Sequence, residues 1–174
     1  MTKKIMFNDK FCLTKAVLAR TKTMTRRVLR DNVPLGNWEE TVKHLSYKVG
    51  EVVAIAQRYN DIGKPQYDKF GNGVPGNSNK MFVKADLLPH HIKITDVKVE
   101  RLRDISDDEI LKEGVLKYYN DKNLFYVSKN TGYAPDVAFP SAHEAFAYLI
   151  DKVSGKGTWE SNPWVAAYSF ELVD

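Results

Sequence analysis

The sequence has few of the features that mark secreted, membrane or metal-bound proteins. It holds one cysteine, Cys12, which has no partner for an internal disulfide, so we expect a reducing, cytoplasmic setting. The first apolar run, Ile5 to Phe7, is too short for the apolar part of a secretion signal. No apolar run reaches the length of a membrane span, so we expect no membrane partner.

Recognisable metal and cofactor motifs are missing as well. The adjacent histidines His90 and His91 have no cysteine, histidine or aspartate around them at the spacing of a zinc site. The glycines of residues 71–73 and 155–157 form neither a P-loop nor a dinucleotide fingerprint. The sequence therefore predicts no metal and no cofactor.

What the chain does have is enough apolar sequence for a core and an uneven distribution of charge. Its 174 residues, 43% of them hydrophobic, predict a single domain over 1–174. The first 30 residues carry nine lysines and arginines against one acid, Asp9, although the whole chain is only +4. If these cations cluster in space they form a site for phosphate or another anion, and the alternative is a solvated basic face.

Apolar periodicity and capping residues predict the elements of a mixed fold. Thr14 is a plausible N-cap for a helix over 14–20, and Ser106 and Ser141 each begin a capping box. The alternation of apolar residues changes phase at Thr95 and Asp96, which predicts a β-bulge. Strands are predicted over residues 3–7, 52–56, 81–85, 92–102 and 165–173, and helices over 14–20, 37–45, 106–113 and 141–154.

This order of elements has no β-α-β rhythm. We therefore expect an α+β fold, a small and mostly antiparallel β-barrel with short helices packed around it. Residues 60–80 are predicted as a long loop or irregular hairpin, and 116–140 as short hairpin strands or a surface excursion.

The densest polar stretch runs from Arg20 to Arg27 and combines four cations with three threonine hydroxyls. Its threonines favour extended structure or a tight turn over continued helix. In an extended segment the adjacent Arg26 and Arg27 point to opposite faces, so that one can face a ligand.

Four segments, taken in order, resemble the ASCH-domain proteins often encoded in phages and prophages, within the PUA-like superfamily. They are residues 22–27, residues 50–53, residues 97–106 continuing to Gly114, and residues 159–164 with the strand that follows to Glu171. The resemblance implies a PUA-like barrel with a cleft at the Lys22-Thr23-Met24-Thr25 turn.

The resemblance implies two functions. The first is binding of RNA, or of a nucleotide or modified nucleobase, in a basic cleft of a cytoplasmic protein. The residues expected to bind are Arg20, Lys22, Thr23, Arg26, Arg27, Gln57, Trp159 and Trp164. The alternative is an amidohydrolase that removes an acyl group from N4-acetylcytidine or a related nucleoside. By motif position its catalytic residues would be Lys22, Thr25 and Glu113.

The residues themselves are compatible with several roles. Burial and neighbouring arginines would lower the pKa of Lys22, so that the neutral amine could take a proton from Thr25, with Glu113 as proton shuttle. Lys22 could instead be a charged phosphate contact, and Glu113 a solvated surface residue. Trp159 and Trp164 could stack a base or pack in the core. A third possibility is a protein-binding role for the loop of residues 60–80.

Overall fold

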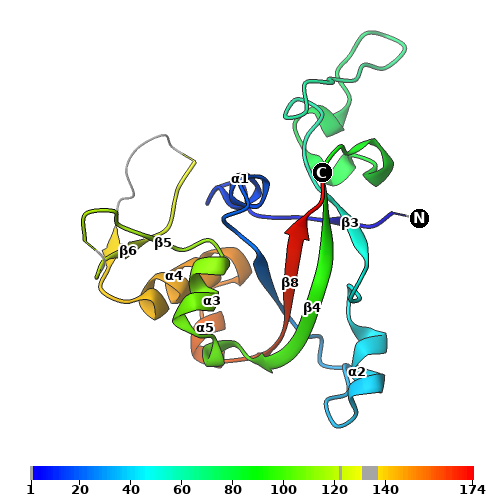
Figure 1. The fold of residues 1–174 in the computed structure, drawn as a ribbon. Helices are drawn as coiled ribbons and strands as arrows, with labels where there is room; N and C mark the ends of the chain where they lie inside the picture. The colour runs from blue at the N-terminus through cyan, green and yellow to red at the C-terminus, as the bar shows by residue number, and fades with distance from the viewer. Residues whose placement is uncertain (1, 122, 131–136) are drawn as a thin grey trace.

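The computed structural model describes residues 2–121, 123–130 and 137–174, and its main feature is a strongly curved five-stranded sheet (Figure 1). The strand order is β1-β3-β4-β8-β2, and only the β1–β3 pair is parallel. The strands are β1 (Lys4–Ile5), β3 (Val52–Ile55), β4 (His91–Arg101), β8 (Trp164–Leu172) and β2 (Met24–Val28). A mixed α+β fold with mostly antiparallel pairing is therefore confirmed.

The remaining elements surround this sheet. A smaller sheet has the order β5 (Leu116–Lys117), β6 (Phe125–Tyr126) and β7 (Ala138–Phe139). The α-helices are α1 (Leu13–Leu18), α2 (Trp38–His44), α3 (Asp107–Lys112), α4 (Ala142–Ser154) and α5 (Thr158–Ser161). Figure 1 shows α3, α4, α5 and the small sheet together on one side of the large sheet, while residues 58–90 project at the top. Part of the 116–140 stretch, residues 122 and 131–136, lies outside the described residues.

The predicted β-barrel is not confirmed. Among the described residues, β1 and β2 lie at opposite edges of the large sheet and each pairs with one neighbour. The predicted bulge is present, because the register between β4 and β8 shifts between Ile94 and Asp96. This irregularity bends the two long central strands, and β2 lies beside β8.

The main core lies between the large sheet and α4. Ala145, Phe146, Leu149 and Ile150 occupy one face of α4 and are buried in the same hydrophobic cluster as residues of β4 and β8. The predicted cap of this helix is present, since the Ser141 hydroxyl accepts a hydrogen bond from the Glu144 amide at 3.1 Å. The later part of α4, residues 146–154, lines one cavity with Thr25, Arg26 and Arg27 of β2 and so lies close to the polar stretch of residues 20–27.

Two local predictions are wrong. Thr14 lies inside α1 rather than at its N-cap, which is Cys12 in a left-handed conformation, and the Thr14 hydroxyl donates to Asp9 Oδ1 at 2.6 Å. Residues 81–85 form no strand, because they overlap two 3-10 helices, Lys80–Phe82 and Ala85–Leu87. The Lys4 ammonium binds the carbonyls of Met81 and Val83 at 2.6 and 2.7 Å, so these acceptors are not available to a neighbouring strand.

Among the described residues, no helix is long and apolar enough to cross a membrane.

Candidate functional site

The site is built where β2 passes the C-terminal end of α3. Lys22, Thr25 and Arg26 are each at most 5% exposed, although they belong to the most polar stretch of the sequence. Burial of cations in this way requires partners, because an isolated charge in a protein interior is strongly destabilising. The partners come from distant parts of the chain, on β4 and α3.

Lys22 is fully engaged by oxygen acceptors. Its ammonium donates to the backbone carbonyls of Met24 at 2.6 Å and Glu113 at 2.7 Å, and to the Glu113 carboxylate (Oε2) at 3.1 Å. Three acceptors match the three protons of an ammonium group, so the observed geometry fits the charged form. Glu113 caps the end of α3, and only 5% of it is exposed.

Arg26 is the centre of the network. Its guanidinium donates to Glu113 Oε1 through Nη1 at 2.9 Å and to Glu100 Oε1 through Nη2 at 2.7 Å. Nη2 also contacts the carboxylate of Glu109. With a side chain that is 0% exposed, Arg26 is held by three carboxylates from β4 and α3.

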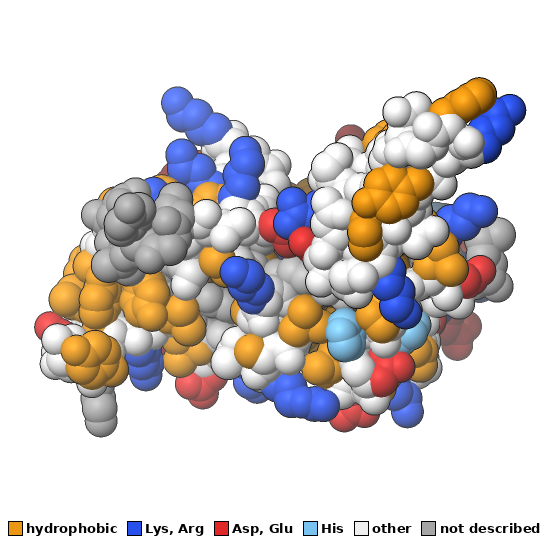
Figure 2. Space-filling view, turned by 90° about the horizontal axis from the view of Figure 1, so that it is seen from above, with side chains coloured by type: hydrophobic (Ala, Val, Ile, Leu, Met, Phe, Trp, Pro, Cys, Tyr) orange, Lys and Arg blue, Asp and Glu red, His pale blue; other side chains and the backbone are white. Residues whose placement is uncertain are grey.

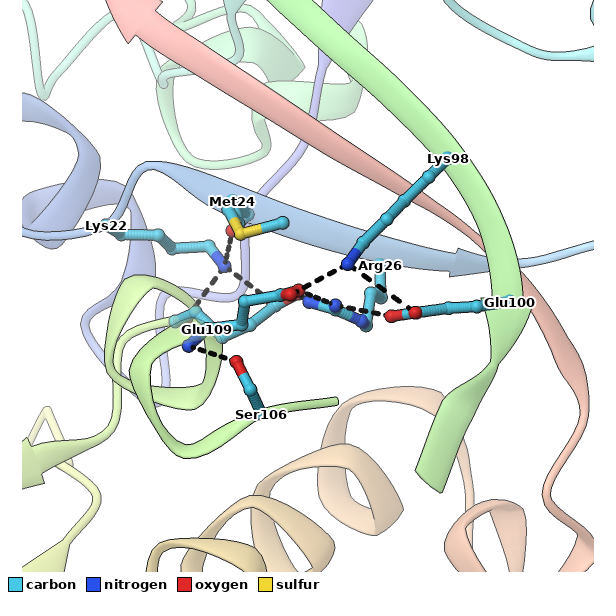
Figure 3. A network of polar contacts seen from close by, with 8 residues as sticks. Lys22, Met24, Arg26, Lys98, Glu100, Ser106 and Glu109 are labelled. Carbon is cyan, nitrogen blue, oxygen red and sulfur yellow. Dashed lines mark hydrogen bonds and ion pairs between the residues drawn. The ribbon is translucent and has the colours of Figure 1, made fainter. Parts of the chain in front are cut away.

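Lys98 joins the network from β4 (Figure 3). Its ammonium lies 2.7 Å from Glu109 Oε1 and 3.5 Å from Glu100 Oε2. We call these six side chains the ion network. It consists of Lys22, Arg26, Lys98, Glu100, Glu109 and Glu113, and it contains three cations and three anions. The network is therefore balanced in charge and does not form the basic cleft that the sequence predicted.

Burial lowers the pKa of Lys22 below its ordinary value, and the Glu113 carboxylate opposes this by raising it. The positive charges of Arg27 and Arg26 lower the pKa of Lys22 further. The net shift is downward, in the direction that the sequence predicted. Lys22 is thus a lysine that loses its proton more easily than an exposed one.

Gly114 lets the end of α3 approach α1 closely. Its φ of 116° is in the left-handed region that favours glycine, and a Cβ atom placed there would lie 2.9 Å from the Leu13 side chain. The same Cβ would be in ordinary contact with Cδ of Lys22, at 3.8 Å. The glycine predicted at this helix end therefore lets the chain turn in the limited space beside Leu13, directly after Glu113.

A cavity of about 230 Å³, which we call the deep cavity, opens above the network. Its polar lining includes Lys22, Thr25, Arg26, Arg27 and Glu113, and its apolar lining comes mainly from the start of the chain and from α4. The lining residues are Met6, Phe7, Asn8, Leu13, Lys22, Thr25, Arg26, Arg27, Val28, Glu113, Phe146, Leu149, Ile150, Val153 and Ser154. The three residues implied by the resemblance, Lys22, Thr25 and Glu113, thus line one concave site.

Three polar groups in this lining have free hydrogen-bonding capacity. Within the described part of the chain, no hydrogen-bond partner is found for the Thr25 hydroxyl or for the buried Nε atoms of Arg26 and Arg27. Nη2 of Arg27 donates to the Met6 carbonyl at 2.6 Å, and the Arg27 guanidinium lies 5.9 Å from the centre of the Phe7 ring. A hydroxyl and a guanidinium that face one cavity can bind a polar group of a ligand.

The other predicted binding residues lie outside the deep cavity. Arg20 is exposed and donates to the Leu172 carbonyl, and the backbone of Thr23 binds Lys112 and Phe170. Gln57 is buried, with a side-chain oxygen that lacks a partner among the described residues. Trp159 packs edge-on against Phe146.

Trp164 lies at the start of β8, where the Arg101 guanidinium is 4.5 Å from its ring centre. It lines a separate hollow of about 340 Å³ with residues 28–31. The structure thus brings together Lys22, Thr25, Arg26, Arg27 and Glu113, and it leaves Arg20, Thr23, Gln57, Trp159 and Trp164 apart from them.

Sequence reasoning missed Glu100, Glu109 and Lys98. Lys98 and Glu100 are two residues apart on one strand, so they share a face of β4, and this spacing was the available signal. Glu109 was assigned to a capping box, and Ser106 does accept its amide at 3.2 Å. The Glu109 carboxylate nevertheless binds Arg26 and Lys98 (Figure 3).

Across the described ranges, no group of three or more histidine, cysteine, aspartate or glutamate residues is placed to hold a metal ion. The three glutamates of the ion network converge on the guanidinium of Arg26.

Comparisons with known proteins give no family match and no match among curated proteins. Two solved structures are similar over almost the whole chain. A protein from Enterococcus faecalis V583, described by family-model DUF984, has 13% identity and a TM-score of 0.46, covering 100% of this chain and 82% of its own. An ASCH domain from Lactobacillus crispatus JV V101 has 12% identity and a TM-score of 0.42, and the match covers 98% of this chain and 78% of the chain of that structure. At these values neither neighbour assigns a function to this chain.

Proposed function

We propose that the deep cavity is the active site of an amidohydrolase that removes an acyl group from the exocyclic amine of a nucleoside such as N4-acetylcytidine. The whole chain, 1–174, would form one ASCH-like domain of the PUA-like type. One observation carries the proposal: Lys22, Thr25 and Glu113 line a single cavity, in which Lys22 and Glu113 are in contact at 3.1 Å. A flat basic surface, as expected for a protein that only binds RNA, does not fit this geometry.

The size and lining of the cavity support a small, partly apolar substrate. Its volume of about 230 Å³ lies below the range of about 300–1,000 Å³ that is typical of sites for drug-sized ligands. Apolar side chains such as Phe7, Phe146 and Leu149 can contact a base and a methyl group, and the polar groups lie together on β2 and α3. The ion network itself is balanced in charge, so Arg27, which lines the cavity and forms no ion pair among the described residues, supplies the unmatched positive charge of the lining.

The catalytic steps start from the Lys22–Glu113 contact. Transfer of one proton from the Lys22 ammonium to the Glu113 carboxylate gives a neutral amine and a carboxylic acid. Burial favours this transfer, since it lowers the pKa of Lys22. In the observed arrangement Lys22 binds Met24 and Glu113, so the amine must exchange one of these contacts for the Thr25 hydroxyl.

The neutral amine then takes the proton of Thr25 as its oxygen attacks the amide carbonyl carbon. The carbon–nitrogen bond breaks while Glu113 gives its proton to the leaving amine. These transfers restore the ammonium and the carboxylate and leave an acyl ester on Thr25. Water then cleaves the ester and releases the carboxylic acid. The unpartnered Nε of Arg27 is a donor on the cavity wall for the developing negative charge on the carbonyl oxygen.

The test is the release of acetate and cytidine from N4-acetylcytidine, compared between Thr25→Val and Thr23→Val. Both changes replace a threonine hydroxyl by a methyl group on the same segment, but Thr23 does not line the cavity. We expect Thr25→Val to reduce kcat/KM by about a thousandfold or more, because removal of a nucleophile has effects of this size or larger. Thr23→Val should retain most of the activity.

Circular dichroism of both variants controls for folding. Absence of acetate release by the folded wild-type protein would contradict the proposed substrate. Equal loss of activity in the two variants would contradict the role of Thr25.

A further inference from the structure

The deep cavity shares part of its wall with a wider groove that the proposed chemistry does not use. Met6, Phe7, Asn8 and Val153 line both the cavity and a neighbouring hollow of about 540 Å³. A third hollow, of about 570 Å³, shares Asp9, Lys10, Phe11 and Lys152 with the second. Each of these two outer hollows is larger than the cavity, so there is room for a ligand much longer than one nucleoside.

The lining of the two outer hollows, which we call the basic groove, is mainly positive. Its cations come from the N-terminal loop, from the projecting segment of residues 58–90, from the segment after β6 and from α4. Figure 2 shows lysine and arginine side chains beside the hollow that separates the projecting segment from the rest of the molecule. The charged residues of the groove are Lys10, Arg58, Lys80, Lys129 and Lys152, against the single acid Asp9.

These cations differ in how far they are already neutralised. Lys80 is paired with Asp9 at 3.0 Å, and Arg58 with Asp61 at 2.8 Å. The side chains of Lys10 and Lys152 are exposed and form no ion pair within the described residues. These two lysines can therefore bind an added anion without breaking an existing pair.

The basic groove also contains an aromatic surface. Tyr148, which is half-buried, lines the outermost hollow and packs edge-on against Phe11 with ring centres 6.4 Å apart. The ammonium of Lys152 lies 5.5 Å from the centre of the Tyr148 ring. Positive charge along a groove combined with an aromatic ring is the arrangement by which proteins hold single-stranded nucleic acid.

We infer that the basic groove binds the phosphate backbone of a single-stranded nucleic acid, one nucleoside of which enters the deep cavity. This inference rests on the proposed function, because it places the acylated nucleoside of the strand in the cavity. It assigns the substrate to the class of modified oligonucleotides rather than free nucleosides. Lys10 and Lys152 supply phosphate contacts outside the cavity, while the chemistry takes place at Thr25.

The experiment measures binding of a fluorescently labelled oligocytidylate by anisotropy over a series of salt concentrations. The double variant Lys10→Gln/Lys152→Gln is compared with Lys43→Gln/Lys156→Gln, which removes the same charge from residues outside the groove. We expect the groove variant to bind at least tenfold more weakly at low salt. Loss of two phosphate contacts should also reduce the slope of log K against log salt by about 1.4. The control variant should bind like the wild type.

Three outcomes would overturn the inference. These are equal weakening in both double variants, cytidine monophosphate binding as tightly as the strand, and an acidic peptide of similar charge binding as tightly as the strand. The same variants are assayed for hydrolysis of free N4-acetylcytidine, which the groove variant should retain. Hydrolysis without strand binding would contradict the inference and leave the proposed function in place. Strand binding without hydrolysis would contradict the proposed function and leave the groove as a binding site for the strand.

Discussion

The charged residues beneath the deep cavity are matched in sign and largely buried, whereas those of the basic groove are mostly positive and more exposed. Arg26, with a side chain that is 0% exposed, has three carboxylate partners, and Lys10, which is exposed, has none among the described residues. Desolvation explains the difference, because a buried charge needs partners and an exposed one is stabilised by water. The two regions therefore suit different tasks.

A balanced, buried network keeps its groups in fixed positions, and this is a requirement of acid–base catalysis. Exposed, unmatched cations keep their charge available for an anionic ligand, at the expense of a strong dependence on salt. The basic cleft predicted from the sequence is thus not one surface in the structure: the ion network is balanced in charge, and the unmatched cations of the basic groove are other residues.

The largest effect expected on stability follows from Arg26→Met. This change leaves the carboxylates of Glu100, Glu109 and Glu113 without their shared partner, and breaking a buried ion pair in this way typically lowers the free energy of unfolding by about 3–5 kcal/mol. Urea denaturation measures this change in the free energy of unfolding. The change in the groove, Lys10→Gln/Lys152→Gln, should alter the same quantity by no more than about 0.5 kcal/mol. Similar losses in both variants would remove the distinction between the two regions.

A smaller effect is expected from Glu109→Gln, and it should depend on pH. Burial raises the pKa of Glu109, but hydrogen bonds from Lys98 and Arg26 lower it, and the net pKa is below the ordinary 4.5. A carboxylate with a lowered pKa in the folded state contributes stability above its unfolded pKa, and this contribution is lost as the pH falls through the folded pKa. The variant should thus be less stable at neutral pH, and its difference from the wild type should narrow below 4.5.

Denaturation curves at several pH values check this expectation, with Glu39→Gln as the control. Glu39 is an exposed residue of α2 outside the ion network, so its removal should leave the pH dependence nearly unchanged. A constant difference between wild type and Glu109→Gln at all pH values would contradict the assigned role of the Glu109 carboxylate.

Local signals predicted much of the fold and the central part of the site. The cap at Ser106 and the glycine at position 114 marked the ends of α3, and so the position of Glu113 on the chain. The resemblance then brought together Lys22, Thr25 and Glu113, and the structure places all three in one cavity. These features depend on spacing along the chain, which a sequence displays directly.

The features that were missed depend on contacts between distant segments. Glu100 lies 74 positions from Arg26 and Glu109 lies 83 positions from it, and no local pattern marks either as its partner. The strand predicted over 81–85 was wrong for a similar reason, since the side chain of Lys4 binds the carbonyls of that segment. The groove between Lys10 and Lys152 likewise exists only because α4 packs beside the N-terminal loop.

The most direct test of the central claim is to look for an acyl group on Thr25 during turnover. Wild-type protein is mixed with N4-acetylcytidine, quenched in acid within the first turnovers, digested and analysed by mass spectrometry, with Thr25→Val treated in parallel. An acetyl ester on the wild-type peptide that contains Thr25, and none on the corresponding peptide of the variant, is the predicted result. Continued acetate release by Thr25→Val at the wild-type rate, with no ester on Thr25 in the wild type, would contradict it.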